Sequence, residues 1–296
     1  MLALITGRGG LPAAVVNSVS LRPLICVLDG HIPKSLTPDI SFRIENLGTL
    51  ITTLRNAEIT ELCFCGAVDR PKIDLSEVDE ATSPFLSILA GAVARGEDSS
   101  LRAIIGIFEK SGFKVRGAHE LAPDLLPPLG VLTITPLPQQ AHSDVKLALT
   151  AITTNTKLDL GQSCIIRDGS VLAVEDTRGT DAMLEDIKIS VEPTSAEPPD
   201  PFFDMMDIAG GYLENAADWL SGQVEEKNII GGMLFKTPKV NQDFRIDLPT
   251  IGPDTVEKAI EARLSGIVIS HGDVLVLDKN SVIEKLNDAG MYLWVR

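Results

Sequence analysis

The stretch KTPKVNQDFRIDLPTIG concentrates charged side chains that could do phosphate chemistry. Lys236, Lys239 and Arg245 could neutralise phosphate oxygens, while Asp243 and Asp247 could hold a metal ion or orient a water molecule. In an extended chain alternate side chains emerge on one face, so Asp243, Arg245 and Asp247 would point the same way. We therefore expect this stretch to be a catalytic strand.

A solvated ladder of surface charges is the alternative for this stretch, and such pairs contribute little to stability. The sequence LPTIGP that follows favours a site instead. Its prolines and glycine would fix the exit of the strand and start the next helix, which would hold the charges in place.

A second group of oxygen-bearing side chains lies in EDTRGTDAML. Glu175 and Asp181 flank a glycine, so they could converge from a strand end and a following helix start. Thr180 adds a hydroxyl at the same helix N-terminus. Oxygen ligands suit Mg²⁺, which keeps some of its waters and also binds substrate phosphates. The alternative is a capped helix without a ligand.

The glycines of TGRGGLP could let backbone N–H groups approach a phosphate at a helix N-terminus, where the partial charge is favourable. A nicotinamide-binding fingerprint would need a third glycine at the position of Pro12. Asp29, at the end of the next strand, sits where a ribose-binding acid would. The alternative is a tight strand–helix turn.

Charged residues also follow the apolar strand that ends in CGAVDRPKID. Asp69, Arg70 and Lys72 lie just past Gly66, and ligands of open α/β sheets bind at such strand ends. A solvated loop with an Asp–Arg pair is the alternative. Glu97 and Asp98 in RGEDSSLR, by contrast, are best explained by simple helix capping.

The elements that must position these residues alternate in the first third of the chain. Short apolar strands separated by helices predict a parallel sheet covered on both faces. The proline-rich stretch 121–140 predicts a domain boundary near 135. The expected strands are 2–6, 23–29 and 61–68, and the expected helices are 12–19, 47–55, 84–94 and 100–112.

The second half mixes strands and helices. We expect a hairpin over 164–176 turning at Asp168-Gly169, a strand over 229–236 and helices over 143–154, 254–264 and 281–287. GIVISHGDVLVLDK (266–279) is expected to form another hairpin, turning at Gly272-Asp273. The acidic stretch 190–228 reads as an inserted loop with one helix, YLENAADWL.

Composition narrows the class of protein. The net charge is −15 over 296 residues and no basic face is evident, so we expect no nucleic-acid partner. The four cysteines form no C-x-x-C pair and are expected to be small buried residues in a reducing cytoplasm. Neither a signal peptide nor a membrane span is expected. No G-x-S-x-G elbow or spaced histidine cluster favours nucleophilic catalysis.

Taken together, these pieces resemble the LpxI-type UDP-2,3-diacylglucosamine pyrophosphatases of Gram-negative lipid A synthesis. The resemblance covers almost the whole chain and depends on the order and spacing of its motifs, which include ITGRGGLP, CGAVDRPKIDL, GQSCIIRDGSVLAVEDTRGTDAML and KTPKVNQDFRIDLPTIGPDTVEKA. It implies a Rossmann-like N-terminal domain over 1–134, a linker over 135–142 and a distinct α/β catalytic domain over 143–296. The substrate would lie between the two domains.

The reaction that the resemblance implies is Mg²⁺-dependent hydrolysis of UDP-2,3-diacylglucosamine to UMP and 2,3-diacylglucosamine 1-phosphate, with water attacking the phosphorus on the sugar side. Asp247 matches the family's critical aspartate, and Asp247 and Asp181 are the expected metal ligands. The expected catalytic residues are Asp247, Asp181, Gln242, Asp243, Arg245 and Lys236. The expected substrate contacts are Gly9, Gly10, Leu11, Gly66, Ala67, Val68, Asp69, Arg70, Gln162, Gly179, Thr180 and Thr250.

This sequence departs from the family pattern at two places. Glu185-Asp186 stands where the family usually carries Arg, and Val240 replaces the proline of its K-P-x-Q element. These departures keep open a nucleotide-sugar or lipid-binding protein without turnover. The enzymatic rival is a nicotinamide-dependent oxidoreductase using Gly7, Gly9 and Asp29, against which the missing third glycine and the lack of a catalytic His or Tyr dyad count. We expect a cytoplasmic protein, and leave open peripheral association with the inner membrane and a homodimer.

Overall fold

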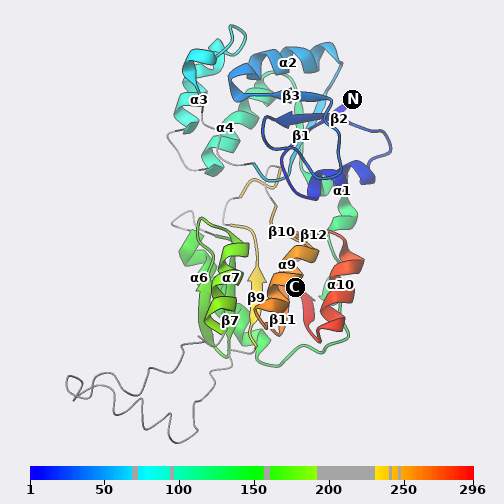
Figure 1. Ribbon diagram of the computed structural model, residues 1–296, viewed down its shortest axis with the longest axis vertical. Helices are drawn as coiled ribbons and strands as arrows, with labels where there is room; N and C mark the ends of the chain where they lie inside the picture. Colours follow the sequence, from blue (N-terminus) through cyan, green and yellow to red (C-terminus); the bar gives the residue numbers. More distant parts are fainter. Residues whose placement is uncertain (69–72, 94–96, 157–160, 192–230, 240–241, 246–247) are drawn as a thin grey trace, which may run out of the picture.

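The computed structural model describes residues 1–68, 73–93, 97–156, 161–191, 231–239, 242–245 and 248–296. Figure 1 shows two layered bodies, one above the other along the long axis, each built around its own sheet. The predicted acidic insertion and its helix fall mostly in 192–230, outside the described residues. Asp69, Arg70 and Asp247 also lie outside them.

The N-terminal body contains a parallel sheet of five strands in the order β3-β2-β1-β4-β5. This order is the one found in half of a Rossmann fold, so the predicted fold class is confirmed. The strands are β1 (Leu2–Thr6), β2 (Leu24–Leu28), β3 (Ile40–Phe42), β4 (Glu61–Cys65) and β5 (Lys114–Arg116).

Helices cover both faces of this sheet because its strands are apolar on both sides. Ala3, Cys26 and Leu62 face one core cluster, whereas their chain neighbours Leu4 and Ile25 face the other. The helices are α1 (Leu11–Ser18), α2 (Leu47–Asn56), α3 (Leu86–Val93), α4 (Glu97–Lys110) and α5 (Ala118–Leu121), with short 3₁₀ turns at Ile44–Asn46, Leu75–Glu77, Ser83–Phe85 and Pro123–Leu125.

Helix α2 approaches the backbone of the loop before α3 unusually closely. A Cβ atom on Gly48 would lie 2.1 Å from the carbonyl oxygen of Ala81, and the Gly48 N–H donates to Thr82 Oγ1 at 2.8 Å. Only glycine leaves room for this contact, so Gly48 fixes where α2 lies against the loop.

The C-terminal body contains a mixed sheet of six strands in the order β6-β13-β11-β9-β7-β8. The three central strands are parallel, and the flanking ones are antiparallel. The predicted hairpin at Asp168-Gly169 is confirmed as β7 and β8. The strands are β6 (Gly130–Val131), β7 (Ser163–Arg167), β8 (Ser170–Val174), β9 (Met233–Lys236), β11 (Gly266–Ile269) and β13 (Tyr292–Val295).

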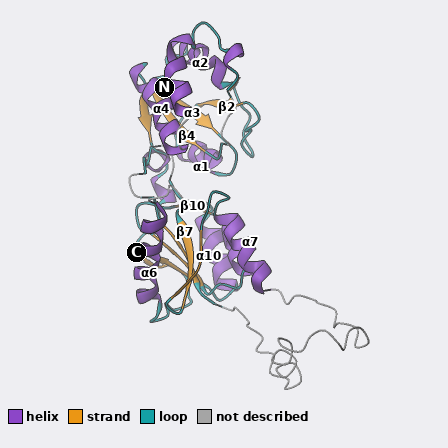
Figure 2. Ribbon diagram, turned by 90° about the vertical axis from the view of Figure 1, so that its left-hand side faces the viewer, coloured by secondary structure: helices purple, strands orange, loops and turns teal. Residues whose placement is uncertain are grey.

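Helix α6 (Ala141–Thr156) covers one face of this sheet, and α7 (Thr180–Val191), α9 (Pro253–Glu261) and α10 (Lys279–Asp288) cover the other. Figure 2 shows α6 on one side of the strands and α7 and α10 on the opposite side. Each face therefore has its own apolar core. None of the helices among the described residues is long and apolar enough to cross a membrane.

The predicted hairpin over 266–279 is wrong. Strand β11 pairs in parallel with β9 and β13, and β12 (Leu275–Val276) pairs in parallel with β10 (Thr250–Ile251) in a separate small sheet. All four residues of β11 are buried, as expected for a central parallel strand. Strand β6 also joins β13, so the second sheet begins before the predicted boundary near 135.

The two bodies share an apolar cluster. Leu248 and Leu275 of the C-terminal half pack with Leu4, Val15 and Ala118 of the N-terminal half. The Lys279 ammonium also donates to the backbone oxygen of Asp124 at 3.4 Å. The short sheet formed by β10 and β12 therefore lies against the N-terminal body, as Figure 1 also shows.

All four cysteines are buried and free, which confirms that they are small interior residues without disulfide partners. Burial raises the pKa of the Cys26 and Cys164 thiols to about 12. A hydrogen bond with Cys63 and burial together raise the pKa of Cys65 well above its usual value.

Candidate functional site

A cluster of buried polar side chains lies at the C-terminal end of strand β9, beside the start of helix α7. Ser163, Glu175, Thr180 and Lys236 are each at most 8% exposed. They come from β7, the residue after β8, the start of α7 and the end of β9. Buried charges are costly unless paired, so this cluster must be held by internal hydrogen bonds.

Those hydrogen bonds converge on one oxygen of Glu175. The Lys236 ammonium donates to Thr180 Oγ1 at 2.9 Å. Thr180 Oγ1 in turn lies within hydrogen-bond distance of Glu175 Oε2, at 3.0 Å, and of Ser163 Oγ, at 2.9 Å. Ser163 Oγ donates to the same carboxylate oxygen, and the backbone N–H of Gln162 reaches it at 3.3 Å. The cluster therefore joins a buried cation to a buried anion through a hydroxyl.

Two glutamine side chains border this cluster. Gln242 Nε2 donates to Gln162 Oε1 at 3.4 Å, and the backbone N–H of Lys239 donates to Gln242 Oε1 at 2.8 Å. Thr237, directly after Lys236, accepts from Ser270 Oγ at 2.7 Å. The structure thus brings the predicted residues Gln162, Thr180, Lys236 and Gln242 together. Gly179 precedes α7 with a φ of +89°, which only glycine adopts freely.

Asp243 and Arg245 form a two-pronged ion pair. Arg245 Nε donates to Asp243 Oδ1 at 2.9 Å and Arg245 Nη2 donates to Oδ2 at 2.6 Å, which holds the pKa of the Asp243 carboxyl below its usual range. Arg245 Nη1 also reaches Glu109 on α4 of the N-terminal body. This ion-pair network connects the two bodies.

The stretch from Lys236 to Gly252 is not one extended strand in its described residues. β9 ends at Lys236, Phe244-Arg245 forms a turn, and strand structure resumes only at β10, which begins at Thr250. The strand prediction for Asp243 and Arg245 is therefore wrong, and their pairing arises from the turn. Thr250 Oγ1 donates to the backbone oxygen of Leu248 at 3.0 Å.

Asp181 points away from the buried cluster. Its exposed carboxylate pairs with Lys258 of α9 at 2.5 Å. Among the residues that the structure describes, no group of three His, Cys, Asp or Glu side chains could hold a metal ion. Asp247, the other expected ligand, lies outside those residues. The described donors therefore do not by themselves make up a site that fits Mg²⁺.

The predicted substrate contacts of the N-terminal body lie in two loops that contact each other. Gly9, Gly10 and Leu11 open α1, while Gly66, Ala67 and Val68 follow β4. The backbones of Arg8 and Ala67 exchange hydrogen bonds of 2.8 and 2.9 Å. A Cβ on Gly7 would lie 2.3 Å from Ala67 O, and one on Gly66 would lie 2.8 Å from Gly7 backbone atoms. Close loop packing thus explains Gly7 and Gly66.

Gly10 faces the C-terminal body. A Cβ on Gly10 would lie 3.5 Å from Leu277 Cδ1, directly after β12. The start of α1 therefore lies at the junction where the two bodies meet.

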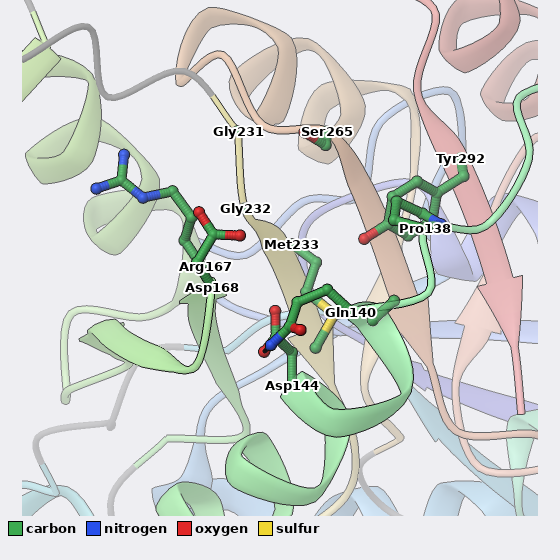
Figure 3. A pocket seen from close by; sticks show the side chains of 11 residues that line it. Pro138, Gln140, Asp144, Arg167, Asp168, Gly231, Gly232, Met233, Ser265 and Tyr292 are labelled. Atoms are coloured by element: carbon green, nitrogen blue, oxygen red, sulfur yellow. Dashed lines mark hydrogen bonds between the residues drawn. The ribbon is translucent and has the colours of Figure 1, made fainter.

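A separate cavity lies at the opposite end of these strands, where β9 begins. It has a volume of about 240 Å³ and includes none of the predicted site residues. Figure 3 shows Asp144 and Tyr292 among its lining side chains. Asp144 accepts from Gln140 Nε2 and from the Gly169 N–H, both at 2.9 Å, so it ties the β7–β8 turn to α6. The cavity is small for a ligand site, and the Asp144 carboxylate is already bound by Gln140 and Gly169.

Sequence reasoning missed Ser163 and the connection of Glu175 to Lys236. Ser163 sits at the start of an otherwise apolar strand, QSCIIR, and a serine at such a position is the signal that could have identified it. Ser163 and Lys236 are direct partners in the β7–β9 pairing, which follows from strand register and not from local sequence.

Comparison with known proteins places this arrangement in a family. The LpxI N-terminal domain model matches residues 1–125, and the LpxI C-terminal domain model matches 128–197 and 213–294. The chain is similar to a protein of Caulobacter vibrioides named UDP-2,3-diacylglucosamine pyrophosphatase LpxI, with 31% identity over 300 residues that cover 99% of this chain and 96% of that protein. The domain matches and this near-complete similarity both show that the chain belongs to the LpxI family.

Proposed function

We propose that this chain hydrolyses the pyrophosphate of UDP-2,3-diacylglucosamine, giving UMP and 2,3-diacylglucosamine 1-phosphate. The name of the Caulobacter relative supports this substrate and reaction. The structural observation that carries the proposal is the buried Lys236 ammonium, held at the end of β9 by Thr180 and Glu175. A fixed cation in a site shielded from water is suited to a non-bridging phosphate oxygen.

The chemistry divides between charge neutralisation and placement of water. Hydrolysis forms a bond from the water oxygen to the sugar-side phosphorus and breaks the bridging P–O bond, whose electron pair leaves with UMP. The attacking water releases a proton to solvent. Lys236 would offset the negative charge of the phosphoryl oxygens. The side-chain amides of Gln162 and Gln242 contact each other, and each can donate to or accept from the substrate. Arg245 already binds two carboxylates, so its part in this proposal is to hold the Asp243 turn against α4.

Mg²⁺ dependence is part of the proposal, with Asp247 and Asp181 as its carboxylates. A hard cation of this kind polarises phosphoryl oxygens. Asp181 supplies one exposed carboxylate, which is paired with Lys258. Because the substrate carries two acyl chains, the proposal also includes peripheral association with a membrane. A homodimer is proposed on the family resemblance alone.

The deciding experiment incubates the purified chain with UDP-2,3-diacylglucosamine and Mg²⁺, with and without a chelator, and measures UMP. We expect UMP to form only with the metal. In ¹⁸O-labelled water the label is expected in the lipid product. Substrate binding without UMP would support the binding-protein alternative, and UMP formation unaffected by the chelator would remove Mg²⁺ from the proposal.

A further inference from the structure

The direction of the hydrogen bonds around Thr180 is fixed by chemistry. An ammonium group has donors only, so Thr180 Oγ1 must accept from Lys236. The single Thr180 hydroxyl proton then goes either to Glu175 Oε2 at 3.0 Å or to Ser163 Oγ at 2.9 Å. In both arrangements this proton stays inside the buried cluster.

The backbone around this cluster holds it in place. Ser163 lies directly opposite Lys236 in the antiparallel pairing of β7 with β9. Glu175 is held by its own N–H, which donates to Ser163 O at 2.9 Å. Thr180 is the first residue of α7, after Gly179 and the turn in which Asp176 pairs with Arg178. The cluster thus joins β9, which carries Lys236, to β7, to the residue after β8 and to the start of α7.

We propose that Glu175 is a positioning residue that orients the Lys236 ammonium through Thr180, and that Thr180 acts as an acceptor for Lys236 and not as a donor to substrate. This inference rests on the proposed function, in which Lys236 meets a phosphate oxygen. It changes the role expected for Thr180, since its proton is not available to a phosphate. Glu175 also places a buried negative charge in the same hydrogen-bonded cluster as the Lys236 ammonium.

A double-mutant cycle tests this inference. Thr180→Val removes the hydroxyl at nearly constant shape, whereas Thr180→Ser keeps it. Because a hydrogen bond to a charged group is lost, we expect T180V to lower kcat roughly 10- to 100-fold with a smaller change in KM, and T180S to restore most of the rate. E175Q is expected to lower kcat in the same way. Thr177→Val, an exposed threonine in the preceding turn, serves as the matched control and is expected to leave kcat unchanged.

The decisive comparison is made in a Lys236→Met background. If Thr180 and Glu175 act through Lys236, T180V and E175Q will lower kcat little further once Lys236 is gone. If T180V costs the same factor with and without Lys236, or raises KM alone, Thr180 contacts substrate directly and the inference is overturned.

A second readout does not depend on turnover. In protein labelled with ¹⁵N-lysine, the buried Lys236 ammonium should give a slowly exchanging ¹H–¹⁵N signal, assigned by its absence in K236M. We expect the signal to persist in T180S and T177V and to be lost in T180V. A signal unchanged in T180V would overturn the positioning role. If the wild type forms no UMP while the signal follows Thr180 as expected, the proposed function fails but the arrangement around Lys236 stands.

Discussion

At the scale of single residues, the Thr180 hydroxyl joins the buried Lys236 ammonium to the buried Glu175 carboxylate. Lys236, Thr180, Gln162 and Gln242 were expected at the site, and the structure brings them together. The link from Lys236 to Glu175 could not be predicted, because it depends on the register between β7 and β9 and on the rotamers of a hydroxyl and a lysine. Asp181 was expected beside this cluster, yet it faces Lys258 because α9 packs next to α7.

The two expected metal carboxylates should respond differently to substitution. We expect Asp247→Ala nearly to abolish hydrolysis while substrate binding persists, because its role is expected to lie in the chemical step. Asp181→Ala should have a milder effect, since the Asp181 carboxylate is exposed and paired with Lys258. Single-turnover rates and equilibrium binding of UDP-2,3-diacylglucosamine distinguish these effects. Loss of binding in D247A with normal turnover of bound substrate would contradict the role assigned to Asp247.

The Asp243 carboxyl should make stability depend on acid pH. Arg245 lowers its pKa in the folded chain, so the folded state binds this proton less readily than the unfolded state. The stabilisation is present above the unfolded pKa of about 3.9 and is lost as pH falls through the folded value. We expect the difference in urea midpoint between wild type and Asp243→Asn to shrink from pH 6 to about pH 3.

Asp288→Asn, at an exposed position on α10, provides the control for this titration. A difference between wild type and D243N that stays constant across the pH range would show that the Asp243 charge does not stabilise the fold.

At the scale of elements, the periodicity of apolar residues predicted strands and helices correctly where only one pairing or packing partner fits the pattern. The parallel strands of the N-terminal sheet, the Asp168-Gly169 hairpin and the final helix follow from local patterns. The hairpin expected over 266–279 failed because two apolar runs around a glycine can pair with each other or with distant strands. The pairing with distant strands forms here, because it buries β11 between β9 and β13.

The close contact of α2 with the loop before α3 gives an element-scale prediction. In Gly48→Ala the new methyl group would collide with the Ala81 carbonyl, so α2 or the loop must shift. We expect a loss of about 2 kcal/mol in stability, measured by urea unfolding. Gly106→Ala is the matched control, because a Cβ there meets no atom within 4 Å inside helix α4, and it should be neutral or stabilising.

Equal changes in stability for G48A and G106A would show that the contact with Ala81 does not determine the outcome.

At the scale of the whole molecule, composition and motif order predicted two α/β bodies, but the contacts between them were not predictable. Leu248 and Leu275 join the core of the other body, and Arg245 reaches Glu109 on α4 across more than a hundred residues of sequence. Such contacts depend on how two finished surfaces meet, for which local patterns give no signal. Arg245 and Leu248 therefore both contact the N-terminal body.

The buried thiols give a whole-molecule prediction. Because all four are inaccessible and the pKa values of Cys26 and Cys164 are raised to about 12, a thiol-reactive dye should label the native chain very slowly at pH 7.5. After denaturation in urea, four thiols should react. Rapid labelling of even one thiol in the native chain would show that a core opens readily.

Because its four native thiols are buried, the wild-type chain is suited to site-specific labelling with fluorescent dyes. One cysteine introduced at Leu21, which is 82% exposed, and another at the exposed residue Asp288 would place one label on each body. Energy transfer between the two dyes could then follow the approach of the two bodies in real time as nucleotide-linked lipid is added, without first removing any native cysteine.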